Sequence, residues 1–191
     1  MAMPIRRADR WTAADLDHMP EDGLRYEVLN GQLVVNAAPK PRHQRLVNWL
    51  DRTLYTLVPA DHEVMTGVGV LIGQDEPIPD LIVLTGEVPP DARGIPVAQV
   101  VLAVEVVSAS TTLQDRMVKP TLYADAGIPH YWRFEINPFN GQLPGEPLPV
   151  LFAHTLGPSG AYELTHRVPA GQAATLHAPF PLTLDPATLL P

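Results

Sequence analysis

The chain has 191 residues, of which 46% are hydrophobic, and it contains no cysteine. This length suits one domain with a buried core, so we expect a single domain over residues 1–191. The absence of cysteine excludes disulfides and thiolate metal sites, and no apolar run approaches the roughly 18 residues of a membrane helix. We therefore predict a cytoplasmic protein with no membrane partner. The formal net charge of -8 argues against binding to nucleic acid through a broad basic face.

The first predicted elements are a short helix and a hairpin. Thr12 can cap a helix whose first turn contains Asp15. Residues 24–35 form two apolar segments on either side of Asn30-Gly31, the strongest short-range signal for a hairpin turn.

A longer helix is predicted over residues 41–58, because leucines recur there at helical spacing (Leu46, Leu50, Leu54 and Leu57). His43 lies at its start. Residues 63–72 then predict a strand in which Gly67 and Gly69 mark a bulge.

Two further strands are predicted at residues 78–85 and 97–107. The second is almost wholly apolar and rich in valine, which indicates a central strand that is buried on both faces. A helix then runs from the caps after residue 107 to about Ala126, with Pro120 marking a kink or a later start. Strands follow at 130–136, 150–154 and 161–168, before a proline-bounded tail. This order predicts a mixed α/β fold.

Two carboxylates stand out within this pattern. Asp80 follows Pro79 at the opening of one strand, and Glu105 lies inside the central strand. A buried acid is costly unless it is paired or binds a metal. Two carboxylates on neighbouring strands, with the backbone carbonyl of Val106 as a third ligand, can hold one Mg2+ or Mn2+. The alternative is a structural ion pair between Glu105 and a residue such as Lys119.

These residues carry a resemblance to the PD-(D/E)xK nuclease superfamily, which has the restriction-endonuclease-like fold. The wider pattern resembles the Uma family of "putative restriction endonucleases", once filed as a domain of unknown function. The match covers roughly residues 24–132 and continues weakly into the tail. Its segments are Arg25-Tyr26-Glu27 with Asn30-Gly31, His43, Ile78-Pro79-Asp80-Leu81, Val104-Glu105-Val106-Val107-Ser108, Asp115-Arg116 with Lys119, residues 123–129, and Tyr131-Trp132.

The resemblance implies a role for each acid and for one lysine. Asp80 and Glu105 would be metal ligands, and Glu27 would ligate or orient a second ion. The superfamily lysine normally stands two residues after the second acid, where this chain has Val107. In this branch the resemblance places it on the next helix, at Lys119, where it would orient the attacking water. Without the resemblance, Lys119 reads as a surface partner of Asp115.

His43 has two interpretations. It can face the site as an acid–base or phosphate-contacting group, or it can be a helix cap or surface residue. Three aromatic residues near the expected site (Tyr123, Tyr131 and Trp132) can stack on a splayed base, although Trp132 is better explained by core packing.

The expected function is Mg2+- or Mn2+-dependent hydrolysis of phosphodiester bonds, with DNA as the substrate and a homodimer that cuts two strands. The acidity of the chain favours one alternative, a catalytically inactive dimeric protein that keeps the fold for interaction. A second alternative is a metal-dependent hydrolase of a small phosphorylated compound, which needs no basic surface.

Overall fold

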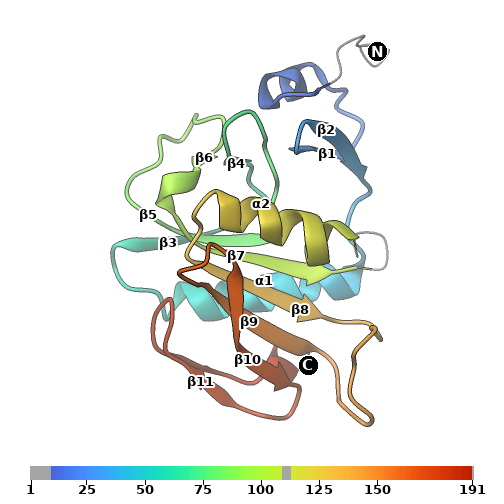
Figure 1. Ribbon diagram of the computed structural model, residues 1–191, viewed down its shortest axis with the longest axis vertical. Helices are drawn as coiled ribbons and strands as arrows, with labels where there is room; N and C mark the ends of the chain where they lie inside the picture. The colour runs from blue at the N-terminus through green and yellow to red at the C-terminus, as the bar shows by residue number, and fades with distance from the viewer. Residues whose placement is uncertain (1–9, 109–112, 191) are drawn as a thin grey trace.

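The computed structural model describes residues 10–108 and 113–190, and a six-stranded mixed sheet lies at its centre (Figure 1). The sheet order is β10-β9-β8-β7-β5-β3, and β7 and β8 form its only parallel pair. Helices α1 and α2 lie on opposite faces. The strands are β3 (His62–Thr66), β5 (Leu81–Thr85), β7 (Val100–Val107), β8 (His130–Glu135), β9 (Val150–Leu156) and β10 (Tyr162–Pro169). The expected mixed sheet flanked by helices is therefore confirmed.

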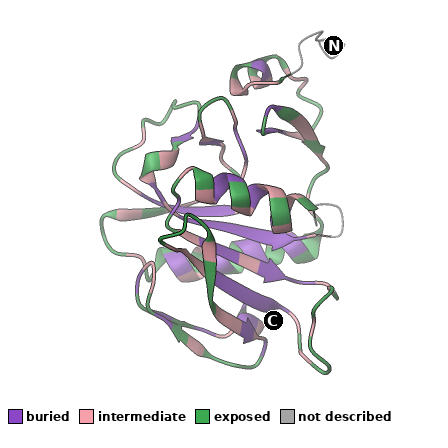
Figure 2. Ribbon diagram, viewed as in Figure 1, coloured by how far each residue is buried: buried purple, intermediate pink, exposed green. Residues whose placement is uncertain are grey.

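Strand β7 is the buried centre of this sheet, as its unbroken apolar sequence predicts. All of its residues from Leu102 to Val107 are buried (Figure 2). Because alternate side chains point to opposite faces, Val104 and Val106 pack on the α1 side, and Ala103 packs on the α2 side. The strand begins at Val100, three residues later than expected, because Val97–Gln99 form a 3-10 turn (η2).

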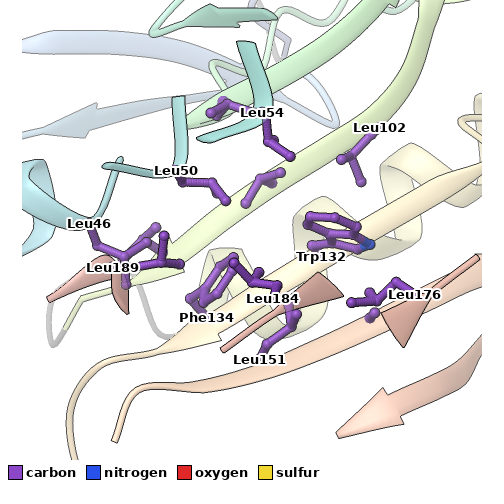
Figure 3. Close-up of a cluster of buried hydrophobic side chains, with 14 of the residues drawn as sticks. Leu46, Leu50, Leu54, Leu102, Trp132, Phe134, Leu151, Leu176, Leu184 and Leu189 are labelled. Atoms are coloured by element: carbon purple, nitrogen blue, oxygen red, sulfur yellow. The ribbon is translucent and has the colours of Figure 1, made fainter. Parts of the chain in front are cut away.

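Helix α1 (Pro41–Tyr55) covers one face with its leucine stripe. Leu46, Leu50 and Leu54 are fully buried in the core that contains Trp132 and Phe134 (Figure 3). The helix ends three residues earlier than expected. Leu57 therefore lies outside the stripe and is 43% exposed.

The C-terminal tail packs against the same core. It consists of β11 (Ala174–Leu176), β12 (Leu182–Leu184) and the 3-10 turn η4 (Pro186–Leu189). Leu176, Leu184 and Leu189 are buried in the same hydrophobic cluster as the α1 leucines (Figure 3). The apolar residues of the tail thus complete the core of their own chain.

One strand prediction is wrong. β3 ends at Thr66, and Gly67, at a φ of 65°, turns the chain out of the sheet instead of forming a bulge. The next segment, β4 (Val70–Leu71), pairs in parallel with β6 (Ile95–Pro96) in a separate two-stranded sheet. In the part of the chain that is described, no helix is long and apolar enough to cross a membrane.

The N-terminal predictions are confirmed. The 3-10 helix η1 (Ala13–His18) is capped by Thr12, whose backbone N and Oγ1 both donate to Asp15 Oδ2 at 2.8 Å. β1 (Arg25–Leu29) and β2 (Gln32–Asn36) form the expected hairpin. Its two turn residues, Asn30 and Gly31, both have positive φ, as a type I′ turn requires.

The second helix follows an irregular start. The π-helical turn η3 (Gln114–Val118) leads directly into α2 (Lys119–Asp125), and Pro120 occupies the first turn of α2. Pro120 thus marks a later start, because a first-turn proline removes no needed hydrogen bond. Gly127, at a φ of 80°, follows the helix end. The expected capping residues 109–112 lie outside the described residues.

Candidate active site

A cavity of about 320 Å³ lies where the pairing of β5 with β7 stops. It brings together five residues singled out from the sequence: Glu27, His43, Asp80, Glu105 and Lys119. They come from the hairpin, α1, the approach to β5, the centre of β7 and the start of α2. The sixth, Val106, reaches the site through its backbone.

Asp80 continues the hydrogen bonding between the strands beyond the last paired residue of β5. Its backbone N donates to Val104 O at 3.1 Å, and its Oδ2 accepts a hydrogen bond from Val106 N at 2.8 Å. His43 Nε2 lies 3.1 Å from the same Oδ2. Burial raises the pKa of Asp80, but His43, Lys119 and the Val106 N–H together outweigh burial and hold the pKa below its usual value. The carboxylate is therefore ionised and fixed in place.

Lys119 is buried among oxygen atoms. Its Nζ lies 3.0 Å from Glu27 Oε1, 3.2 Å from Glu105 Oε1 and 3.2 Å from Ile78 O. Burial lowers the pKa of Lys119, but the surrounding carboxylates raise it by more, so the pKa lies above its usual value. The surface interpretation of Lys119 is therefore wrong, since the residue is 4% exposed and remains a cation.

Glu105 pairs with Lys119 as the ion-pair interpretation expected, and it also accepts a 2.6 Å hydrogen bond from the Tyr123 hydroxyl. Burial raises the pKa of Glu105 well above its usual value, and the charges of Asp115, Asp80 and Glu27 add to the rise against the attraction of Lys119. The site thus holds more negative charge than its one ammonium balances.

Glu27 is fixed at both carboxylate oxygens. Its Oε1 accepts a hydrogen bond from Ile78 N and its Oε2 accepts one from Asn36 Nδ2, each at 2.6 Å. Asn36 lies on β2, opposite Arg25 in the hairpin register. The hairpin therefore supplies both the carboxylate and the amide that orients it.

His43 is buried, so the surface interpretation of this residue is wrong. A carboxylate can only accept hydrogen bonds, so the Nε2 that faces Asp80 carries the proton. Nδ1 is buried and finds no partner in the described part of the chain.

Sequence reasoning missed the burial of Asp115 and the role of Tyr123. Asp115 is 2% exposed and lines the cavity. One signal could have revealed this burial. Asp115 lies four residues before Lys119, so both share one helix face, and burial of Lys119 on that face implies burial of Asp115. The stacking interpretation is wrong for Tyr123, Tyr131 and Trp132, because all three are at most 1% exposed. Core packing of Trp132 is confirmed.

The donor set fits a hard divalent cation. Asp80 and Glu105 supply carboxylate oxygens, and no hydrogen bond to Asp80 Oδ1 occurs within the described residues. In an extended strand the N–H and C=O of one residue point the same way, so the Val106 carbonyl also faces Asp80. Within the described ranges, no group of three or more His, Asp or Glu side chains is placed to hold a metal ion. Mg2+ needs only one or two carboxylates and keeps its remaining waters.

Comparisons with known proteins identify the family of this chain. Residues 13–187 match the model of the Uma2 family, described as "Putative restriction endonuclease". A similar solved structure is that of "a putative nuclease belonging to DUF820 from Anabaena variabilis ATCC 29413", with a TM-score of 0.68 and 15% sequence identity over 94% of this chain and 97% of that one. At this identity the likeness concerns the fold alone. No curated protein matches the chain. Because the family model spans most of its length, the chain belongs to the Uma2 family of putative restriction endonucleases.

Proposed function

We propose that this protein is a Mg2+- or Mn2+-dependent nuclease that hydrolyses phosphodiester bonds in DNA. The observation that carries the proposal is the meeting of Asp80, Glu105 and Lys119 in one cavity, with Glu27 beside them. These side chains come from separate elements, and two carboxylates beside an ammonium suit phosphoryl chemistry. Membership of the Uma2 family supports the same conclusion.

Asp80, Glu105 and the Val106 carbonyl would hold the cation, and Glu27 would orient it or ligate a second ion. When bound, the cation would lower the pKa of a coordinated water and neutralise charge on the scissile phosphate. The protein keeps these oxygens ready through the Val106 N–H on Asp80 and the Tyr123 hydroxyl on Glu105. Such supporting hydrogen bonds orient ligands and tune their basicity.

Lys119 acts as a fixed positive charge. Its raised pKa excludes proton abstraction by Nζ near neutral pH. An ammonium held 3.2 Å from Glu105 can instead donate to the attacking water and stabilise the charge that develops on the phosphate. His43 acts through Asp80, which it holds by its Nε2–H.

Metal titration by calorimetry tests the site. We expect Mg2+ or Mn2+ to bind the wild type, Asp80→Asn to abolish binding, and the exposed control Asp91→Asn to leave binding unchanged. Some such sites fill only when a substrate phosphate supplies a ligand, so plasmid cleavage in Mg2+ and Mn2+ is assayed in parallel.

The same plasmid assay separates the alternatives. Generic phosphoesters and nucleotides are tested beside the plasmid. Cleavage of the plasmid that is lost in Asp80→Asn supports the proposal. If only the small esters are hydrolysed, the substrate is a small phosphorylated compound and not DNA. If the wild type shows no metal binding and no hydrolysis, the remaining explanation is a non-catalytic interaction protein.

We also propose that the active form is a homodimer, since cutting both strands of a duplex requires two sites. One chain has a mass of 20.8 kDa. Light scattering that gives twice this mass supports the dimer, and a monomeric mass with full duplex cleavage refutes it.

A further inference from the structure

The charge inside the cavity opposes a nucleic-acid substrate. Four carboxylates line it (Glu27, Asp80, Glu105 and Asp115), and the buried ammonium of Lys119 lies among them. A phosphodiester is itself an anion, so its neighbouring phosphates need cations outside this interior.

Three cations at the same cavity have no partner of their own. Arg25, Lys40 and Arg42 line it, and none of their side chains makes an ion pair or a hydrogen bond within residues 10–108 and 113–190. The chain has 21 acidic residues against 13 basic ones, so such cations would readily find carboxylates if they served stability alone. Four of the other arginines do so: Arg93, Arg116, Arg133 and Arg167 contact carboxylates.

The positions of these cations follow from the elements that build the site. Arg25 lies two residues before Glu27 on β1, so both side chains point to the same face of the hairpin. Lys40 and Arg42 flank the first residue of α1 and lie just before His43. Both are exposed, and the N-terminal end of a helix adds a partial positive charge.

Arg25 also connects the cavity with a second, smaller one. This cavity measures about 140 Å³ and is lined by Arg25, Asp80 and residues of α1 and the turn after β3. Arg25 and Asp80 therefore line both cavities. A strand whose scissile phosphate lies at Asp80 would pass Arg25 with an adjacent phosphate.

We propose that Arg25, Lys40 and Arg42 form a phosphate-binding rim that holds the backbone of a nucleic-acid strand on both sides of the scissile phosphate. This inference rests on the proposed nuclease function and specifies how an acidic protein binds a polyanion. The rim recognises phosphates, so it contributes affinity without base preference.

Salt-dependent binding tests the rim. A labelled oligonucleotide, single-stranded and as a duplex, is titrated by anisotropy between about 50 and 200 mM KCl. Ca2+ fills oxygen sites in place of Mg2+, and gels verify that the probe stays intact. Each lost phosphate contact reduces the slope of log affinity against log salt by roughly 0.7 to 0.9. We expect the double variant Lys40→Gln/Arg42→Gln to reduce it by about 1.4 to 1.8, and added Arg25→Gln to bring the loss to about 2.1 to 2.7.

The matched control is Arg52→Gln. Arg52 lies on α1, is exposed, stacks on Trp49 and does not line the cavity. Arg52→Gln removes one positive charge away from the cavity, and it should leave the slope unchanged. The double variant alters only exposed side chains, so its fold is retained even if Arg25→Gln is unstable.

Two outcomes would overturn the rim. If the wild type cleaves DNA and the double variant shows the slope and KM of Arg52→Gln, the rim is wrong and the nuclease function stands. If the wild type neither binds nor cleaves any oligonucleotide although metal binding is intact, both the rim and the proposed nuclease function fail.

Discussion

Replacing Lys119 by methionine should destabilise the metal-free protein. At 3.0 and 3.2 Å from two carboxylates, the ammonium gains roughly 5 kcal/mol from each at an effective dielectric constant of about 20. Desolvation offsets part of that attraction, and Glu105 can take up a proton when its partner is gone. Removing one partner of a buried pair typically costs about 3 to 5 kcal/mol, and we expect a loss in this range.

A divalent cation should reverse part of this loss, because it can neutralise the same carboxylates. At 100 times its dissociation constant, a ligand stabilises the folded state by about 2.7 kcal/mol. Urea unfolding is measured in EDTA and in saturating Mg2+ for the wild type, Lys119→Met and Lys40→Met. Lys40, the only other lysine, is exposed, so its variant should stay within about 0.5 kcal/mol of the wild type. If Lys119→Met is as stable as Lys40→Met in EDTA, the caged ammonium is not what neutralises the carboxylates.

Three further predictions concern the rest of the fold. Burial lowers the pKa of His154, and Arg133 lowers it further. The unfolded chain therefore binds more protons, and the free energy of unfolding falls as the pH drops below about 6.5. Measured by urea unfolding, this fall with pH should be shallower in His154→Gln, whereas the exposed control His177→Gln should show the same pH dependence as the wild type. Leu50→Ala should cost about 2 to 5 kcal/mol in the same assay and the exposed Leu57→Ala much less; equal losses would contradict the α1 core. Gly31→Ala should lower stability by about 1 kcal/mol, because φ is 76° there; an unchanged midpoint would refute the type I′ turn.

Elements with strong local signals could be predicted from the sequence. Asn30-Gly31 fixed the hairpin because both turn residues must adopt positive φ. The valine run of β7 predicted a central strand, since only a strand covered on both faces accommodates it. The path after Thr66 could not be predicted, because a glycine that forms a bulge and a glycine that ends a strand have the same sequence signal.

The sequence indicated which residues belong to the candidate site, but not which of them contact one another. The resemblance named Asp80, Glu105 and Lys119, and the structure places them at one cavity. Spacing along the chain could not show that Lys119 would be buried between Glu27 and Glu105, because that arrangement depends on where the hairpin and α2 pack against the sheet. The clustering of cations at the cavity could not be predicted either, because a net charge of -8 describes the whole chain and not one part of its surface.

The cost of this cluster argues for a function beyond folding. Replacing a buried ion pair by apolar side chains of similar volume is often neutral or stabilising by about 1 to 4 kcal/mol. Glu27, Glu105, Asp115 and Lys119 are each at most 4% exposed in a chain whose core consists mainly of aliphatic and aromatic residues. Burial, and then the neighbouring carboxylates, raise the pKa of Glu105 well above its usual value, so keeping this carboxylate ionised costs free energy that a nearby cation offsets. A protein that kept the fold only for interaction would have no use for the charges of this cluster. A protein that binds a divalent cation beside a phosphate requires them.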